Sequence, residues 1–387
     1  MLVIFLMLMH SPTRLQPAMR PLHALATLAL LVPVLRGGSP AAAQKASWYK
    51  GNTHAHTVLS GHGDTSPEDV AQWYLDRGYH FLILSEHNRF IRPDSVDLPP
   101  GRRADFILIP GEEVTGHQVI HTTAMNIRGL VDWTAEHEPK QDVIQSHVDS
   151  TIQAGGTPIL NHPNFEWALT TGDIRPVERL HLFELHNGHP DVHNFGDSTH
   201  VSTERMWDAL LTDGMLIYGV SSDDAHQFQT WGTDISNPGR GWVMVRADTL
   251  TPASVTRAVR GGRFYATSGV LLEDVRRGRR YAVRVDEEGT RREMGSAYLT
   301  GHHVEDGPPG FEIQFIGSGG EILQRVRETE AMFTIPDEEA YVRSRVIFRR
   351  LRSGGGYEAF YAWTQPFFTD ERAARAREYE RGGYHSE

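Results

Sequence analysis

The chain has 387 residues, of which 39% are hydrophobic and 22% charged, ordinary proportions for a soluble globular protein. It contains no cysteine, which excludes disulfide bonds, thiolate metal sites and cysteine nucleophiles. Acidic residues outnumber basic ones by 49 to 38, and the formal net charge is −11. Because so acidic a surface repels nucleic acid, we expect a small-molecule substrate and no nucleic-acid partner.

The first 43 residues have the pattern of a secretory signal peptide. Arg20 precedes an apolar run from Leu22 to Leu35, which Pro33 interrupts, and three small residues, 41–43, follow. The run is too short and broken for a comfortable transmembrane helix, although an uncleaved anchor is the alternative. We therefore expect cleavage near Gln44, a periplasmic or secreted protein, and no stable membrane insertion after cleavage.

From residue 47 to about 270, short apolar runs alternate with amphipathic segments. Ser66 followed by Pro67 predicts a helix start, and Gly78 predicts its end. Further helices are expected at 141–154 and 203–211. Short apolar runs predict buried strands at 81–84, 106–109, 158–160 and 215–220, and residues 180–185 read as a further strand. Repeated strand–loop–helix units predict a largely parallel α/β barrel or sheet, with its chemistry at the carboxyl ends of the strands.

After about residue 270 the pattern changes to short strands, several with a period of two. They are expected at 281–285, 311–315, 331–335, 341–348 and 357–364. This pattern predicts a small antiparallel β-sandwich over 271–368 and a charged helical tail over 369–387. His302 and His303 belong to this region and are interpreted as surface residues.

Histidines and acids gather where the predicted strands end. His54 and His56 are two residues apart, so on a strand both rings point to one face. Nine candidate metal ligands follow this trend: His54, His56, His62, His87, Glu113, His121, His162, Asp224 and His226. A mostly imidazole set with a few carboxylates suits zinc, manganese or iron, whereas calcium and magnesium prefer oxygen ligands. The set predicts two or three divalent ions.

The same segments contain candidates for catalysis and substrate binding. Glu113 is placed to bridge two ions because a carboxylate has two oxygens, and Asp224 is the second catalytic carboxylate. His186 and His189, on either side of Asn187, are candidates for a proton donor or substrate clamp. They are equally well interpreted as loop histidines with local hydrogen bonds. Asn187 is itself a substrate candidate, and Asn161 and Asn187 are alternatively interpreted as supports of the ligands. Arg89 could hold an anionic oxygen or simply be solvated.

The order of these motifs resembles the PHP (polymerase and histidinol phosphatase) family over Trp48 to Phe264. The motifs are H-x-H at 54–56, His62, an acid–His pair at 86–87, G-x-E at 111–113, His121, N-H-P at 161–163 and D-x-H at 224–226. The leader, the G-E-E-V-T segment and the appended β-region are similar to the CehA/McbA branch, relatives of carbaryl hydrolase. The resemblance implies a distorted (β/α)7 barrel with a trinuclear site. It also implies hydrolysis of phosphate esters in most branches, and of carbamate or aryl ester bonds in this one.

The resemblance further implies how the ligands divide among three ions. The first set is His54, His56, Glu113 and Asp224. The second set is His62, His87 and His226. The third set is His121 and His162, with Glu113 bridging. Glu86 stands where the family usually has Asp, and we expect it to orient His87 rather than to bind metal.

These observations predict an exported multinuclear hydrolase that uses a metal-bound hydroxide. Phosphodiesters, carbamates and aryl esters are favoured over dianionic monoesters, because Arg89 is the only obvious cation near a predicted ligand. The aromatic side chains of Phe228 and Trp231 are available for an apolar pocket. The alternative is an exported protein that binds metal or carbohydrate without catalysis.

Overall fold

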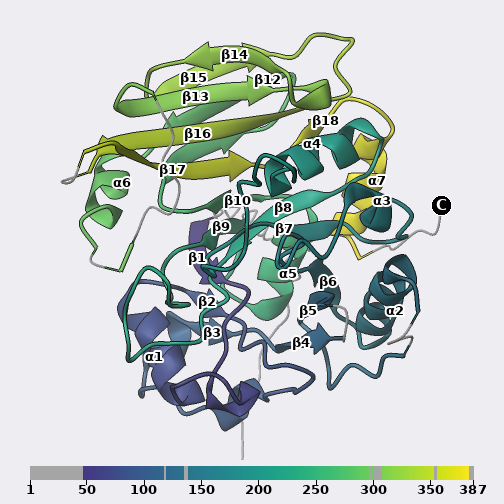
Figure 1. Ribbon diagram of the computed structural model, residues 1–387, viewed down its shortest axis with the longest axis vertical. Helices are drawn as coiled ribbons and strands as arrows, with labels where there is room; N and C mark the ends of the chain where they lie inside the picture. Colours follow the sequence, from purple (N-terminus) through teal and green to yellow (C-terminus); the bar gives the residue numbers. More distant parts are fainter. Residues whose placement is uncertain are drawn as a thin grey trace, which may run out of the picture. The chain divides into compact units, whose positions relative to one another are not determined.

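The computed structural model describes residues 47–382 except 117–118, 135–137, 297, 300–306 and 353–354. The predicted signal peptide therefore lies outside the described residues, as do His302 and His303. The described part contains three β-sheets and several helices, which confirms the predicted mixed α/β class (Figure 1).

The largest sheet has ten strands in the order β14-β13-β16-β17-β10-β9-β1-β2-β3, with β18 paired to β16. Its strands are β1 (Ser47–Asn52), β2 (Phe81–Leu82), β3 (Ile107–Leu108), β9 (Trp242–Ala247), β10 (Phe264–Thr267), β13 (Gly310–Ile316), β14 (Ile322–Val326), β16 (Tyr341–Leu351), β17 (Tyr357–Thr364) and β18 (Phe367–Phe368). The pairs β1–β2 and β2–β3 are parallel, and the other pairs are antiparallel. Pairing of β17 with β10 makes the C-terminal strands an extension of the sheet that contains β1.

The second sheet has five strands in sequence order. They are β4 (Gly111–Thr115), β5 (His121–Met125), β6 (Thr157–Leu160), β7 (Leu182–Asn187) and β8 (Tyr218–Ser222). Strands β6, β7 and β8 are parallel, as the apolar runs predicted. Strands β4, β5 and β6 are antiparallel, which differs from the largely parallel expectation because a short connection returns β5 directly beside β4.

A third, smaller sheet packs on the C-terminal part of the large one. It consists of β11 (Leu272–Arg276), β12 (Arg280–Val285) and β15 (Glu330–Thr334). The rings of Tyr281 and Phe333 lie 5.9 and 5.4 Å from the ring of Phe315 on β13, which joins the two layers.

The helices are α1 (Pro67–Asp76), α2 (Lys140–Gln153), α3 (Thr171–Ile174), α4 (Thr203–Thr212), α5 (Pro252–Arg260), α6 (Glu287–Glu293) and α7 (Arg372–Glu380). Helix α1 begins directly after Ser66, as its capping residue predicted. The side chains of Ser66 and Ser202 accept hydrogen bonds from the first turns of α1 and α4. Between residues 47 and 382, no helix that the structure describes has the length and apolar character needed to cross a membrane.

Two parallel β-bridges connect the first two sheets at their strand ends. Ala55, after β1, bridges to Ala225, after β8, and His87, after β2, bridges to Glu113 on β4. The carboxyl ends of strands from both sheets therefore meet in one region, where the predicted ligands lie.

Candidate metal centre

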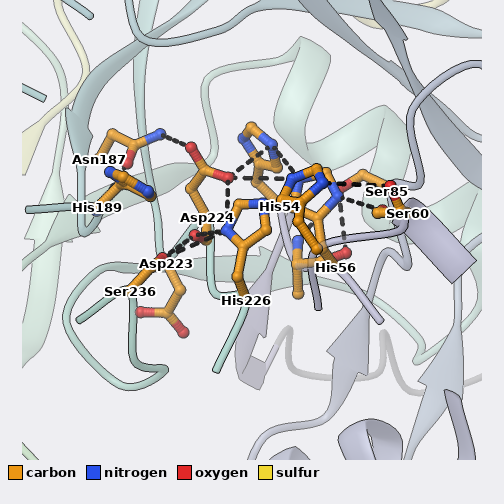
Figure 2. Close-up of polar contacts among 12 residues, drawn as sticks. His54, His56, Ser60, Ser85, Asn187, His189, Asp223, Asp224, His226 and Ser236 are labelled. Carbon is orange, nitrogen blue, oxygen red and sulfur yellow. Dashed lines mark hydrogen bonds and ion pairs between the residues drawn. The ribbon is translucent and has the colours of Figure 1, made fainter. Parts of the chain in front are cut away.

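Two extended segments hold the first four ligands side by side. The His56 amide donates to the Ala225 carbonyl at 2.8 Å, and the Asp224 amide donates to the His54 carbonyl at 2.9 Å. Because alternate residues of a strand share a face, the rings of His54 and His56 point together, and the two backbone hydrogen bonds bring Asp224 and His226 beside them (Figure 2). Both H-x-H rings are completely buried.

The ligand atoms of this group have the spacing that a bound ion requires. His54 Nε2 lies 3.1 Å from His56 Nε2 and 3.2 Å from Asp224 Oδ1, and His56 Nε2 lies 3.3 Å from the same oxygen. Two atoms about 2.1 Å from a tetrahedral ion are separated by about 3.4 Å. The three atoms therefore match the edges of one coordination polyhedron.

Glu113 faces different histidines with its two oxygens. Its Oε1 lies 3.1–3.3 Å from ring nitrogens of His54, His121 and His162. Its Oε2 lies 2.8 Å from His87 Nδ1 and 3.4 Å from His56 Nε2. Oε2 is buried and accepts no hydrogen bond of normal geometry among the described residues. Because Oε1 and Oε2 face different histidines, Glu113 is placed to bridge two ions.

Four groups of three side chains have ligand atoms within 4.8 Å of one another. They are His56, His87 and His226; His54, Glu113 and His162; His54, His56 and Asp224; and His87, Glu113 and His121. Together they contain eight of the nine predicted ligands and form buried clusters suited to more than one metal ion.

His62 is the ninth predicted ligand, and it lies at the edge of the cluster. Its Nε2 is 3.3 Å from His87 Nε2, and its ring stacks 4.5 Å from that of His226. In the described structure the group around His87 and His226 is completed by His56. This differs from the division that the resemblance implied, in which His62 completes that set.

The charges within the cluster favour metal binding. Burial raises the pKa of Glu113 and Asp224, but the surrounding histidines outweigh it and hold both pKa values well below the usual range. Burial lowers the pKa of His56 to about 4 and that of His226 to about 2. At His54, His87 and His162 the nearby carboxylates outweigh burial and raise the pKa, so a bound ion would take the place of protons there. Ionised carboxylates and neutral imidazoles are the forms that bind metal.

The acids next to the two ligand carboxylates point elsewhere. Glu112 accepts a hydrogen bond from the Val131 amide through Oε1. Asp223 accepts from the amides of Arg240 and Gly241 and from the hydroxyl of Tyr74. These neighbours hold the loops around the cluster, whereas Glu113 and Asp224 face the histidines.

Glu184 is a buried residue of the site that the sequence did not indicate as functional. Its Oε1 lies 2.9 Å from His54 Nδ1, and its Oε2 accepts hydrogen bonds from the His162 amide and the Asn187 side chain. A carboxylate behind a ligand histidine fixes its tautomer and raises its basicity. The available signal was an acid in the middle of an otherwise apolar predicted strand.

Two predicted amides lie where they support the ligands. Asn161 donates to Glu113 Oε1 at 2.8 Å, and Asn187 donates to Asp224 Oδ2 at 3.1 Å. Asn187 was a substrate candidate, but its contacts with Asp224 and Glu184 make it a residue that positions the cluster.

Glu86 has a different partner from the one expected. Its carboxylate accepts hydrogen bonds from the Thr57 amide and the Ser60 hydroxyl, and Ser60 contacts His56 Nδ1 at 2.9 Å. Glu86 therefore orients His56 and not His87. His87 instead lies 2.7 Å from the Thr115 hydroxyl. Glu184 thus orients His54 directly, and Glu86 orients His56 through Ser60.

His186 does not lie with the ligands, contrary to the expectation for a catalytic proton donor. A β-bulge between Glu184 and His186 shifts the register of β7 against β8. Glu184 and Asn187 consequently face the cluster, while the His186 ring stacks 5.5 Å from Trp363 and contacts the Ser221 hydroxyl. His186 lines a separate cavity of 240 Å³.

The other substrate candidates lie outside the buried cluster. The His189 ring is 5.7 Å from the ring of His226 and 5.9 Å from that of Phe165, so it borders the site. Arg89 is exposed and donates to the Leu59 carbonyl. Phe228 is 9% exposed and packs on Trp73 in the core, so it is no pocket wall.

Comparison with known proteins adds no relative. The sequence matches no protein-family model, and the comparison with curated proteins gives no match either. The assignment of a candidate multinuclear metal centre therefore stands on the geometry of these buried histidines and carboxylates.

Proposed function

We propose that the chain is an exported, multinuclear metal-dependent hydrolase of the PHP type. The observation that carries the proposal is Glu113, whose two oxygens face two sets of histidines. A scavenging protein needs no such bridge, whereas a hydrolase gains from two adjacent cations. The bridges Ala55–Ala225 and His87–Glu113 are compatible with the barrel that the resemblance implies, because they join strand ends of the large sheet to those of the five-stranded sheet.

Divalent zinc, manganese or iron ions in this cluster would acidify a coordinated water and polarise the bond to be cleaved. The chain's own residues provide the charge and order of the site. Ionised Glu113 and Asp224 offset the cationic charge, and Glu184 and Glu86 hold His54 and His56 in place. His189, at the border of the site, is in our proposal the residue that donates a proton to the leaving group.

The surroundings of the cluster favour a substrate with little negative charge. Phe165 lies 5.4 Å from the ring of His162 and offers an apolar surface beside the ligands. Arg89 is exposed to solvent and donates a hydrogen bond to the Leu59 carbonyl. Water therefore screens its charge, and it would attract a dianionic substrate only weakly. We therefore propose phosphodiesters, or neutral aryl esters and carbamates, as the substrate class, ahead of phosphate monoesters.

The test combines metal analysis with kinetics. Full-length protein loaded with zinc or manganese is assayed for kcat/KM on bis-nitrophenyl phosphate, a naphthyl carbamate and nitrophenyl phosphate. We expect bound metal in excess of one ion per chain and the lowest kcat/KM for the monoester. Glu113→Gln should reduce both metal content and turnover, because an amide binds cations more weakly than a carboxylate. Glu112→Gln is the matched control and should do less.

Two outcomes would overturn the proposal in different ways. Equal metal loss from Glu113→Gln and Glu112→Gln would show that Glu113 does not bridge two ions. A fully metal-loaded protein that hydrolyses none of the three substrates would favour the non-catalytic metal-binding alternative.

A further inference from the structure

A cavity of 540 Å³ lies at the opposite strand ends from the metal cluster. It is lined by Tyr218 and Phe264, the first residues of β8 and β10, whereas Asp224 lies two residues beyond the last residue of β8. The volume lies within the range of small-molecule sites. The cavity is therefore a second concave site, separate from the ligands described above.

The lining of this cavity is strongly cationic in an acidic chain. Five arginines contribute to it: Arg246, Arg263, Arg276, Arg277 and Arg377. The lining acids are Asp248 and Glu380, so the lining carries 5 − 2 = +3 charges. Asp274 pairs with Arg246 and Arg276 and reduces this to +2, against −11 for the whole chain. Asp248, one of the two lining acids, pairs with Arg257, which lies outside the lining.

Arg277 is held rigidly by groups that do not neutralise it. Its Nη1 and Nη2 donate to the carbonyls of Pro366 and Gly261. Within the part of the chain that the structure describes, no carboxylate forms an ion pair with Arg277. Its position depends on Gly262, which has a φ of 60° and where a Cβ would come within 2.8 Å of Arg277 Nη1. An oriented, uncompensated guanidinium suits a phosphate group.

A second guanidinium and aromatic side chains complete the site. Arg263 pairs with Glu380 through Nη1, while its Nη2 is buried and has no hydrogen-bond partner among the described residues. Trp48 and Phe367, both partly exposed, also line the cavity. Arg263 therefore contributes charge to the lining, and the aromatic rings can contact a flat group attached to a phosphate.

From these contacts we propose that the cavity binds a small organic dianion of the phosphate-monoester class. Its phosphate oxygens bind Arg277 within the positive field of the other lining arginines, and its organic part lies against Trp48. The inference is independent of the reaction at the metal cluster.

The test measures binding of phenylphosphonate, a dianion that a hydrolase cannot cleave, to the metal-loaded full chain by calorimetry. We expect Arg277→Gln to weaken binding by about tenfold, the effect of one charge-assisted contact. Arg377→Gln, at an exposed position on α7 that tolerates substitution, should weaken it by a few-fold. Arg92→Gln is the matched control, because Arg92 is exposed and distant in the chain from the lining, and it should bind as the unchanged protein does.

A variant of the metal centre separates the two sites. Glu113→Gln should bind phenylphosphonate normally if the arginine-lined cavity is the site. Loss of binding in Glu113→Gln together with normal binding in Arg277→Gln and Arg377→Gln would assign the anion to the metal cluster and overturn the proposal. Absence of binding to the unchanged protein would overturn it as well. We expect phenylphosphonate to bind more tightly than inorganic phosphate, because the organic group contacts the aromatic lining; equal binding would overturn the assignment of the organic part to Trp48.

Discussion

Glu184 connects three parts of the metal centre through one buried carboxylate. It contacts the ring of His54, the backbone of His162 and the side chain of Asn187. The carboxylate thereby sets which nitrogen of His54 remains free for a metal. A residue that never touches the ion can thus determine how strongly the ion is held.

We expect Glu184→Gln to lower metal affinity by about 10- to 100-fold, the range for partners behind ligand histidines. The amide keeps the size of the side chain but removes the charge that stabilises the His54 tautomer. Competition with a chromogenic zinc chelator measures the affinity. Glu178→Gln, an exposed position in the preceding loop, should leave the affinity unchanged. Equal affinities for both variants would refute the role of Glu184.

Strand β7 shows how an irregularity in one element selects the side chains of the site. The register shift between Glu184 and His186 places residues 184 and 187 on the side of the cluster. Gly219 on β8 leaves room for the bulged residue, because a Cβ there would lie 2.9 Å from the Cβ of Leu185. The bulge and the glycine opposite it therefore form one structural unit.

Substituting Gly219 by alanine should disturb this unit. Forcing a methyl group against Leu185 costs about 1–3 kcal/mol of unfolding free energy, as overpacking usually does. Movement of β7 would also displace Glu184 and Asn187, so bound metal should fall. Urea denaturation and metal analysis measure the two effects. The control is Gly129→Ala, where a Cβ would meet nothing within 4 Å; similar losses in both variants would contradict the argument.

At the scale of the whole molecule, the C-terminal strands contact helix α4 and strand β8, which lie next to the metal centre in the chain. Arg343 on β16 is completely buried and forms ion pairs with Glu204 and Asp208 on α4. The Gln365 side chain bonds both backbone groups of Gly219 on β8. The chain beyond residue 270 thus supports the five-stranded sheet. That sheet carries Glu184 on β7, and Asp224 follows its strand β8.

The sequence predicted the parts of this arrangement that depend on local periodicity. Strand alternation aims His54 and His56 together, and the capping residue Ser66 marks the start of α1. It could not predict the position of His186, because a bulge reverses the face of a side chain without changing the local pattern. The Glu86–Ser60–His56 contact depends on a long-range approach of two loops, which spacing does not encode. The sequence pattern also did not predict the antiparallel pairing of β4 with β5, because spacing does not encode which strands lie side by side.

His181 makes the stability of the whole fold dependent on pH. It is 8% exposed, donates from Nδ1 to the Leu216 carbonyl at 2.8 Å, and packs 4.3 Å from the ring of Tyr379 on α7. Burial, with Arg375 and Arg260 nearby, lowers its pKa from 6.5 to about 4. The unfolded chain therefore takes up this proton at a higher pH than the folded chain does. Its contribution to stability is complete above about pH 6.5 and is lost as the pH falls towards 4.

The loss from this one histidine is on the order of 3 kcal/mol. Urea denaturation at a series of pH values between 7 and 4, with metal removed from all samples, gives the unfolding free energy. His181→Gln keeps a donor for the Leu216 carbonyl but cannot be protonated, so its stability should fall less steeply with pH. His200→Gln, at an exposed histidine, should retain the slope of the unchanged protein. If His181→Gln also retains that slope, the pH dependence arises from other groups, and His181 is not the residue that links acid to unfolding.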